Sequence, residues 1–217
     1  QSGFRIQDAD KVLYFDPYQL TETTHDADWI FISHSHSDHC DPGSVQKIYQ
    51  STTRLITEPE SAAKMNQIVA DITIVAPGDS ITIEGRKIEL VPSYNLVKTN
   101  HPKSKNYLGF IVTLSDGRKV YQAGDTDKIP EMATIDTDIA LLPCGGTFTM
   151  IASEAAEAAQ TIQPKIVVPM HYGSAVGSVR DAEKVKELLL DSIEVVILDP
   201  GQTVPITTRV SNWTISY

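Results

Sequence analysis

The side chains best suited to chemistry gather in one short segment, His34–His39, which reads His-Ser-His-Ser-Asp-His and which we call the histidine motif. Imidazole nitrogens and carboxylate oxygens are the ligands that zinc and similar borderline metals prefer. The motif follows the apolar run Trp29–Ile32, so we expect it at the carboxyl end of a strand, where α/β sheets place their sites. Its first two histidines can project toward one ion, and its last two residues can face a second. The competing interpretation is a histidine-rich surface turn that binds metal only adventitiously.

Three further residues are candidate ligands. Asp125 follows an apolar segment, and a carboxylate there could bridge two ions; otherwise it is a turn aspartate bonded to its own backbone. His171 ends the predicted strand Ile166–Met170, where it is either a ligand or a lone histidine at the edge of the core. His101 lies in a polar loop as a ligand, a substrate contact or an exposed side chain. We interpret His25, in a turn, as a surface residue.

Two successive β-rich halves, each with helices after its strands, are expected to position these residues. Short runs rich in β-branched or aromatic residues and bounded by turn formers predict the strands. In the first half the expected strands are Val12–Phe15, Trp29–Ser33, Arg54–Thr57, Ile72–Val75, Ile81–Ile83 and Lys87–Val91, and the expected helices are Pro42–Gln50 and Pro59–Val69. In the second half the expected strands are Leu108–Leu114, Lys119–Ala123, Asp138–Leu142, Lys165–Pro169, Val195–Leu198 and Thr203–Ile206, and the expected helices are Ser153–Thr161 and Val179–Leu190. We expect one α/β domain over residues 1–217.

Composition excludes several classes of protein. The 217 residues are 41% hydrophobic and 21% charged, as in ordinary globular chains. The net charge of −10 argues against nucleic-acid binding, because that affinity rests on neutralising phosphates with cations. No apolar stretch has the length of a membrane-spanning helix, and two cysteines, Cys40 and Cys144, indicate reduced thiols rather than a disulfide framework. We therefore expect a cytoplasmic protein that acts on a small molecule, without nucleic-acid or membrane partners.

Taken together, the motifs resemble the metallo-β-lactamase superfamily. The match in order and spacing comprises the histidine motif, Gly124-Asp125-Thr126 and Pro169-Met170-His171-Tyr172. A compact branch, labelled metal-dependent hydrolases and similar to the ascorbate-6-phosphate lactonase and N-acyl-phosphatidylethanolamine phospholipase group, resembles the chain at Leu13–Pro17, Tyr94-Asn95, His101–Lys103, Gly124–Asp127 and Thr147–Met150. The resemblance covers nearly the whole chain. It implies that the first strand starts before Ser2, and we expect residues to precede Gln1, which is not methionine.

The resemblance implies a four-layer αββα sandwich of two mixed sheets with flanking helices and a dinuclear centre of two divalent ions, usually zinc, sometimes manganese or iron. It implies that one ion is held by His34, His36 and a third histidine, the other by Asp38, His39 and His171, with Asp125 as the bridge. Many relatives carry the third histidine directly after a strand, where this chain has Tyr94-Asn95. Because Asn95 is a poor zinc ligand, either His101 takes that place or the first ion lacks a histidine.

The expected activity is hydrolysis by a hydroxide that the two ions share. A bound metal lowers the pKa of water from 15.7 to about 7, which provides a nucleophile for a carbonyl or phosphoryl centre. Asp38 can also orient the hydroxide or carry its proton, and His101 is the other candidate catalytic residue. The expected substrate is a small, anionic metabolite with an ester, lactone or phosphodiester bond. A phospholipid surface is disfavoured, because no basic amphipathic helix is evident.

Five further residues, Asp16, Asp41, Asn95, Lys103 and Tyr172, are expected to support the site or to contact substrate. Asp16 and Asp41 are candidate acceptors for the N–H groups of ligating histidines, and Asp41 is alternatively only a helix cap. Lys103, with its neighbour Lys105, is a candidate substrate contact, and the alternative is that both lysines lie in a solvated loop. Tyr172 is also a candidate substrate contact, and the alternative is that it only packs against its neighbours. The segment 147–150 is expected to form a rim loop.

Two other functions stay open. One is a mono-iron dioxygenase of the same fold; the di-iron redox type usually replaces the second motif histidine with glutamate, and His36 argues against that type. The other is a non-catalytic member whose ions are fully enclosed by protein ligands, whereas catalytic metals keep an open position. The resemblance also implies relatives that assemble as dimers or larger rings, so a homo-oligomer is compatible with it, although the sequence reveals no interface.

Overall fold

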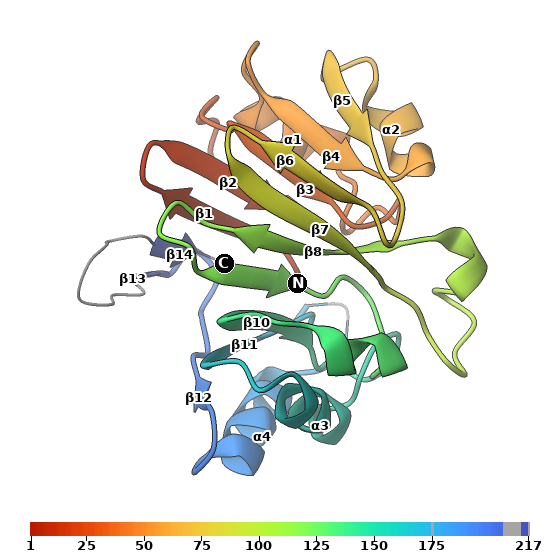
Figure 1. Cartoon of the computed structure of the whole chain (residues 1–217), viewed down its shortest axis with the longest axis vertical. Coiled ribbons are helices and arrows are strands. Elements are labelled where there is room, and N and C mark those ends of the chain that lie inside the picture. Colours follow the sequence, from red (N-terminus) through yellow and green to blue (C-terminus); the bar gives the residue numbers. More distant parts are fainter. Residues whose placement is uncertain (175, 206–213, 217) are drawn as a thin grey trace. The chain divides into compact units, whose positions relative to one another are not determined.

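The computed structural model describes residues 1–174, 176–205 and 214–216, which divide into two compact units. The N-terminal unit comprises Ser2–Val75 and the segment from Leu198 onward, and the central unit comprises Gln1 and Ala76–Ile197. Within the described residues, each unit has one seven-stranded mixed sheet, and each has flanking helices (Figure 1). The prediction of two mixed sheets with flanking helices is confirmed.

The sheet of the N-terminal unit has the order β13-β14-β1-β2-β3-β4-β5. Its strands are β1 (Phe4–Asp8), β2 (Lys11–Phe15), β3 (Trp29–Ile32), β4 (Arg54–Thr57), β5 (Asp71–Ile74), β13 (Thr203–Pro205) and β14 (Thr214–Ser216). Its helices are α1 (Pro42–Ile48) and α2 (Pro59–Met65). Each helix begins with proline directly after an acidic N-cap, because proline has no N–H group that the first turn would leave without a partner.

The core of the N-terminal unit explains the apolar run before the histidine motif. Ile30 and Ile32 of β3 pack in a buried cluster with Val45 and Ile48 of α1. On the alternate positions Phe31 stacks on Phe15, with ring centroids 4.7 Å apart. All four residues of β3 are therefore buried, as expected for a strand covered on both faces. Because β2 and β3 are parallel, both end at the same edge of the sheet, and Asp16 and the histidine motif follow there.

The sheet of the central unit has the order β12-β11-β10-β9-β8-β7-β6. Its strands are β6 (Ser80–Ile83), β7 (Arg86–Pro92), β8 (Leu108–Thr113), β9 (Lys119–Gln122), β10 (Ile139–Pro143), β11 (Ile166–Met170) and β12 (Glu194–Val195). Its helices are α3 (Ala152–Ile162) and α4 (Val179–Leu189), which lie side by side in Figure 1, and the short 3₁₀ helices η1 (Lys103–Lys105) and η2 (Pro130–Thr134). None of the helices in the described parts of the chain is long and apolar enough to cross a membrane.

Strand directions gather the remaining candidate residues at one edge of the central sheet. The strands β9, β10 and β11 are parallel, and β7 runs in the same direction because it is antiparallel to β8, which is antiparallel to β9. The carboxyl ends of β7, β9 and β11 therefore lie at the same edge. The segments that follow them carry Asn95 and His101, Asp125, and His171, respectively.

The chain ends differ from the sequence-based expectation. The sequence does not predict β14, and the resemblance implies a first strand that starts before Ser2, whereas β1 begins at Phe4. The sequence also places 203–206 in the second half, whereas β13 belongs to the sheet of the N-terminal unit. Ile206 itself lies outside the described residues. The physical reason is that β14 pairs with β1, Arg5 opposite Ser216, and no local pattern encodes a pairing across the whole chain.

Candidate functional site

Asp16 organises the candidate ligands of the N-terminal unit. Its side chain is fully buried and accepts three hydrogen bonds: from the Ser33 backbone N–H at 2.7 Å, from the Ser33 hydroxyl at 2.7 Å, and from Nδ1 of His39 at 2.9 Å. Asp16 adopts a left-handed backbone conformation with φ 41°, an uncommon state for a residue other than glycine. The carboxylate fixes the His39 ring so that Nε2 is available to a ligand, and Nε2 lies 3.6 Å from Oδ2 of Asp38.

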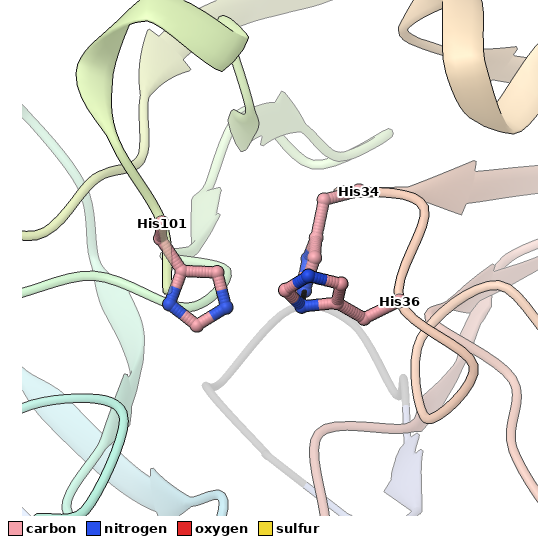
Figure 2. A group of neighbouring side chains, drawn as sticks. All are labelled: His34, His36 and His101. Carbon is pink, nitrogen blue, oxygen red and sulfur yellow. Dashed lines mark hydrogen bonds between the residues drawn. The ribbon is translucent and has the colours of Figure 1, made fainter. Parts of the chain in front are cut away.

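Ser33 extends this support to His34. Its hydroxyl donates its one hydrogen to Asp16, so it accepts from Nδ1 of His34, at 2.9 Å. Nε2 of His34 then lies 3.0 Å from Nδ1 of His36, with the two rings edge to face. Figure 2 shows these two imidazoles turned toward each other on the loop after β3. Two imidazole nitrogens this close can serve the same ion.

Helix α2 holds the backbone of the histidine motif. The Ser35 hydroxyl donates to Glu60 at 3.0 Å, and Lys64 donates to the carbonyl of Ser35. These contacts fix the residue between His34 and His36, and with it the direction of both side chains. The structure thus places the three imidazoles and the one carboxylate of the motif after the end of β3.

Asp125 is the centre of the candidate ligands in the central unit. Its Oδ2 lies 3.0 Å from Nε2 of His171 and 3.4 Å from Nε2 of His101, and all three side chains are buried. His171 has a left-handed backbone with φ 57°, and its N–H donates to the carbonyl of Gln1 at 2.8 Å. His101, also drawn in Figure 2, projects from the segment that leads into η1. The carboxyl ends of three strands thus contribute to one buried group.

Hydrogen bonds brace the two loops that carry Asp125 and His101. Ser93 donates to the carbonyl of Asp125 at 2.9 Å, and the backbone of Tyr94 exchanges bonds with the hydroxyl of Thr126. The buried carboxylate of Asp127 accepts from the Leu96 N–H at 2.9 Å. The residues after Asp125 therefore clamp the start of the loop that leads to His101.

Some predicted support residues make contacts away from the histidines. Asp41 caps α1: its side chain accepts from the Gly43 N–H at 3.0 Å and the Ser44 hydroxyl at 2.7 Å, so the helix-cap interpretation describes it. Lys103 pairs with Glu131 at 2.8 Å and lies over the ring of Tyr94. Tyr172 is buried.

The structure agrees with the predictions that His25 is a surface residue and that the two cysteines form no disulfide. His25 is exposed. Cys40 and Cys144 are buried and free, and burial raises the pKa of Cys40 to about 11 and that of Cys144 to about 12. Both are therefore neutral thiols near neutral pH, poor ligands compared with thiolates.

The donor chemistry of the two units fits a divalent ion. His and Asp side chains that could hold a metal ion include all seven predicted ligands, His34, His36, Asp38, His39, His101, Asp125 and His171. In the N-terminal unit an oxygen acceptor lies within hydrogen-bond distance of Nδ1 of His39 and of His34, so Nε2 is the nitrogen of each ring that would face an ion. Neutral imidazole and carboxylate are a donor set for zinc and similar metals rather than for calcium or magnesium. Their role as ligands stays a prediction.

Sequence reasoning missed two contributors. Ser33 connects Asp16 to His34, and the carbonyl of Phe148 accepts from the side chain of Asn95 at 3.0 Å. Ser33 stands directly before the motif, so its position was a usable signal. Nothing in the sequence marks a backbone carbonyl in the 147–150 loop as a partner of Asn95.

Comparisons with known proteins bear on this site. The family model described as "Beta-lactamase superfamily domain" matches residues 1–171. The UPF0173 metal-dependent hydrolase TK0141 of Thermococcus kodakarensis is 34% identical over 214 residues, which cover 93% of this chain and 94% of that protein. The homologue PYRAB05000 of Pyrococcus abyssi, with the same family name, is 34% identical over 217 residues, with coverage of 93% and 94%.

Solved structures show the same fold. A candidate metal-dependent hydrolase of Parabacteroides distasonis aligns with a TM-score of 0.77 and 34% identity, covering 90% of this chain and 88% of that one. Igni18, a metallo hydrolase of Ignicoccus hospitalis, aligns with a TM-score of 0.78 and 24% identity, covering 96% of each chain.

Proposed function

We propose that this chain, which belongs to the β-lactamase superfamily and is a metal-dependent hydrolase, uses two divalent ions to cleave an ester, lactone or phosphodiester bond. Zinc is the metal that we propose first. The proposed ligands are His34, His36 and His101 for one ion and Asp38, His39 and His171 for the other, with Asp125 as the bridge. The proposed substrate is a small anionic metabolite, and the proposed location is the cytoplasm.

One observation supports the ligand assignment above the others. Nδ1 of His39 lies 2.9 Å from a carboxylate oxygen of Asp16, which can only accept, so this nitrogen carries the proton. The other nitrogen, Nε2, lies 3.6 Å from the carboxylate of Asp38. A neutral imidazole would present a lone pair to that carboxylate, an unfavourable pairing that a cation removes. The arrangement of His39 therefore supports its proposed role as a metal ligand.

The protein's own residues have distinct tasks in the proposed reaction. Asp16 and Ser33 hold the rings of His39 and His34 in the binding tautomer. Asp38, which is only partly buried, can accept a proton from the attacking water and orient it. When bound, such ions supply a water of lowered pKa, polarisation of the bond to be cleaved and positive charge that attracts an anionic group. The net charge of −10 supports a small substrate rather than nucleic acid.

Elemental analysis of the purified protein and of its His101→Ala variant tests the proposal. We expect about two zinc or manganese ions per chain, falling toward one in the variant. The exposed histidine gives a matched control, because His25→Ala should keep both ions. Retention of both ions in His101→Ala would remove His101 from the ligand set.

A hydrolysis panel completes the test. A p-nitrophenyl ester, a simple lactone and bis(p-nitrophenyl) phosphate, each assayed with zinc, manganese or iron restored, identify the bond class. Cleavage that requires the restored ion and is lost in His39→Ala is expected. A single iron per chain with oxygen consumption and no hydrolysis would contradict the proposal.

A further inference from the structure

Asn95 and His101 are joined more closely than a loop requires. The backbone N–H of Asn95 donates to the carbonyl of His101 at 2.7 Å. The side-chain oxygen of Asn95 in turn lies 3.2 Å from the His101 backbone nitrogen and 3.0 Å from Nδ1 of its ring. Asn95 is buried, so these bonds are not shared with bulk water. The asparagine thus contacts both the backbone and the ring of one proposed ligand.

A third partner decides which way the carboxamide faces. The backbone carbonyl of Phe148 lies 3.0 Å from Nδ2 of Asn95. A carbonyl oxygen can only accept, so the NH₂ group must face Phe148 and the amide oxygen must face His101. The loop after β10 therefore sets the orientation of a side chain that follows β7.

This orientation determines the proton on His101. An amide oxygen cannot donate, so Nδ1 of His101 must carry the hydrogen in their 3.0 Å bond. The neutral ring then has its lone pair on Nε2, the nitrogen that lies 3.4 Å from Oδ2 of Asp125. Which ring nitrogen can bind a metal is set by the bond of the other nitrogen.

We infer that Asn95 is a positioning residue that acts through His101: the carbonyl of Phe148 orients its carboxamide, and the carboxamide oxygen keeps Nε2 of His101 available to an ion. The inference rests on the proposed role of His101 as a ligand. It gives Asn95 a role other than direct metal binding. Asparagine suits the place because it donates on one side and accepts on the other. Aspartate retains only the acceptor, and leucine retains neither.

Nitrogen NMR of the metal-free protein tests the inference directly. Long-range ¹H–¹⁵N spectra at mildly alkaline pH report which ring nitrogen of each histidine is protonated, and His101→Gln assigns the signal. We expect the Nδ1–H tautomer for His101 in the unsubstituted protein and in Asn95→Asp, which keeps an acceptor. In Asn95→Leu we expect a tautomer mixture. Asn100→Leu, an exposed asparagine in the same loop, is the matched control and should leave the signal unchanged.

Zinc affinity, measured by competition with a chelator, provides the second readout. Loss of a residue that supports a metal ligand costs about 10- to 100-fold in affinity, so Asn95→Leu should weaken binding of one ion by this factor, and Asn100→Leu should not. Circular dichroism and thermal unfolding verify that both variants fold. An Nε2–H tautomer in the unsubstituted protein, or an unchanged tautomer in Asn95→Leu, would overturn the inference.

The two proposals can fail separately. If the protein binds no metal but His101 shows the expected tautomers, the proposed function fails while Asn95 still positions the ring. If two ions bind with equal affinity in Asn95→Leu and the unsubstituted protein, the proposed function stands and the inference is wrong. If Asn95→Asp disturbs the tautomer as much as Asn95→Leu, the acceptor is not the cause, and the inference is wrong as well.

Discussion

His39 in the N-terminal unit and His101 in the central unit have the same arrangement of hydrogen-bond partners, but the chemical groups that provide it differ. Each ring has an oxygen acceptor near Nδ1, Asp16 at 2.9 Å or Asn95 at 3.0 Å. Each has a carboxylate near Nε2, at 3.6 Å for His39 and 3.4 Å for His101. The acceptor of His39 is a carboxylate, whereas that of His101 is a neutral amide.

The difference between a carboxylate and an amide partner distinguishes two effects that an acceptor at Nδ1 can have. Either group fixes the tautomer and the ring direction, but a carboxylate also makes the imidazole a more basic ligand. Asp16 additionally accepts two bonds from Ser33, so it organises three donors. Asn95 takes its own orientation from Phe148. We therefore expect the support of His39 to depend on one buried charge, and the support of His101 to depend on a chain of neutral hydrogen bonds.

The largest expected effect comes from Asp16→Ala. The substitution leaves three buried donors, on Ser33 and His39, without their acceptor, and each such loss costs roughly 1–3 kcal/mol. We expect the free energy of unfolding of the metal-free protein, from urea titration, to fall by roughly 3 kcal/mol or more. Elemental analysis should show loss of an ion. A loss of stability no greater than that of Asp41→Ala would contradict the central role of Asp16.

The next effect comes from exchanging the two kinds of acceptor. Asp16→Asn gives His39 a neutral amide but turns an N–H group toward one of the donors of Ser33 or His39, so we expect zinc affinity to fall by about 10- to 100-fold. Asn95→Asp keeps an acceptor for His101, so its affinity should change less. Asp16→Asn also covers the case in which Asp16→Ala does not fold. Equal losses in Asp16→Asn and Asn95→Asp, measured by chelator competition, would remove the distinction between the two supports.

The same contrast marks what sequence could predict. The histidine motif and the strand before it are local: an apolar run, then ligands within six residues, so β3 and its loop were predictable. The strand ends that carry Asp125 and His171 follow from the same kind of pattern. The function of Asn95 depends on a carbonyl 53 residues away, and the pairing of β1 with β14 spans the chain. A backbone carbonyl has no sequence signature, which is why the sequence marks Asn95 as a departure and a candidate support but does not identify Phe148 as the residue that orients it.

A smaller effect distinguishes Asp41 from Asp16, two aspartates near the same motif. Asp41 caps α1, so Asp41→Ala should cost about 1 kcal/mol of unfolding free energy and leave metal content unchanged. Although burial raises the pKa of Asp41, hydrogen bonds from Ser44, Gln19 and Gly43 outweigh it and hold the pKa below its ordinary value of 3.8. The stabilisation is therefore present above pH 3.8 and is lost as pH falls through the lower folded value. Urea titrations of the unsubstituted protein and of Asp41→Ala should give unfolding free energies that differ at neutral pH and converge at acidic pH. A difference that stays the same at both pH values would contradict this account.

The smallest effect is expected at Lys103, whose positive charge is paired with Glu131 at the surface of the central unit. Glu131, 2.8 Å away, raises the pKa of Lys103 and offsets its charge, so little of that charge reaches a substrate. Exposed ion pairs of this kind contribute little to stability or binding, because water and salt screen them. Lys103→Met should change KM for an anionic ester by about twofold or less, with Lys98→Met, which removes the partner of Asp127, as the matched control. A large rise in KM for the anionic ester but not for a neutral ester with the same leaving group would instead make Lys103 a substrate contact. In that case a positive side chain of the central unit would bind the substrate. The contrast between a charged and a neutral support would then hold only for the rings of His39 and His101.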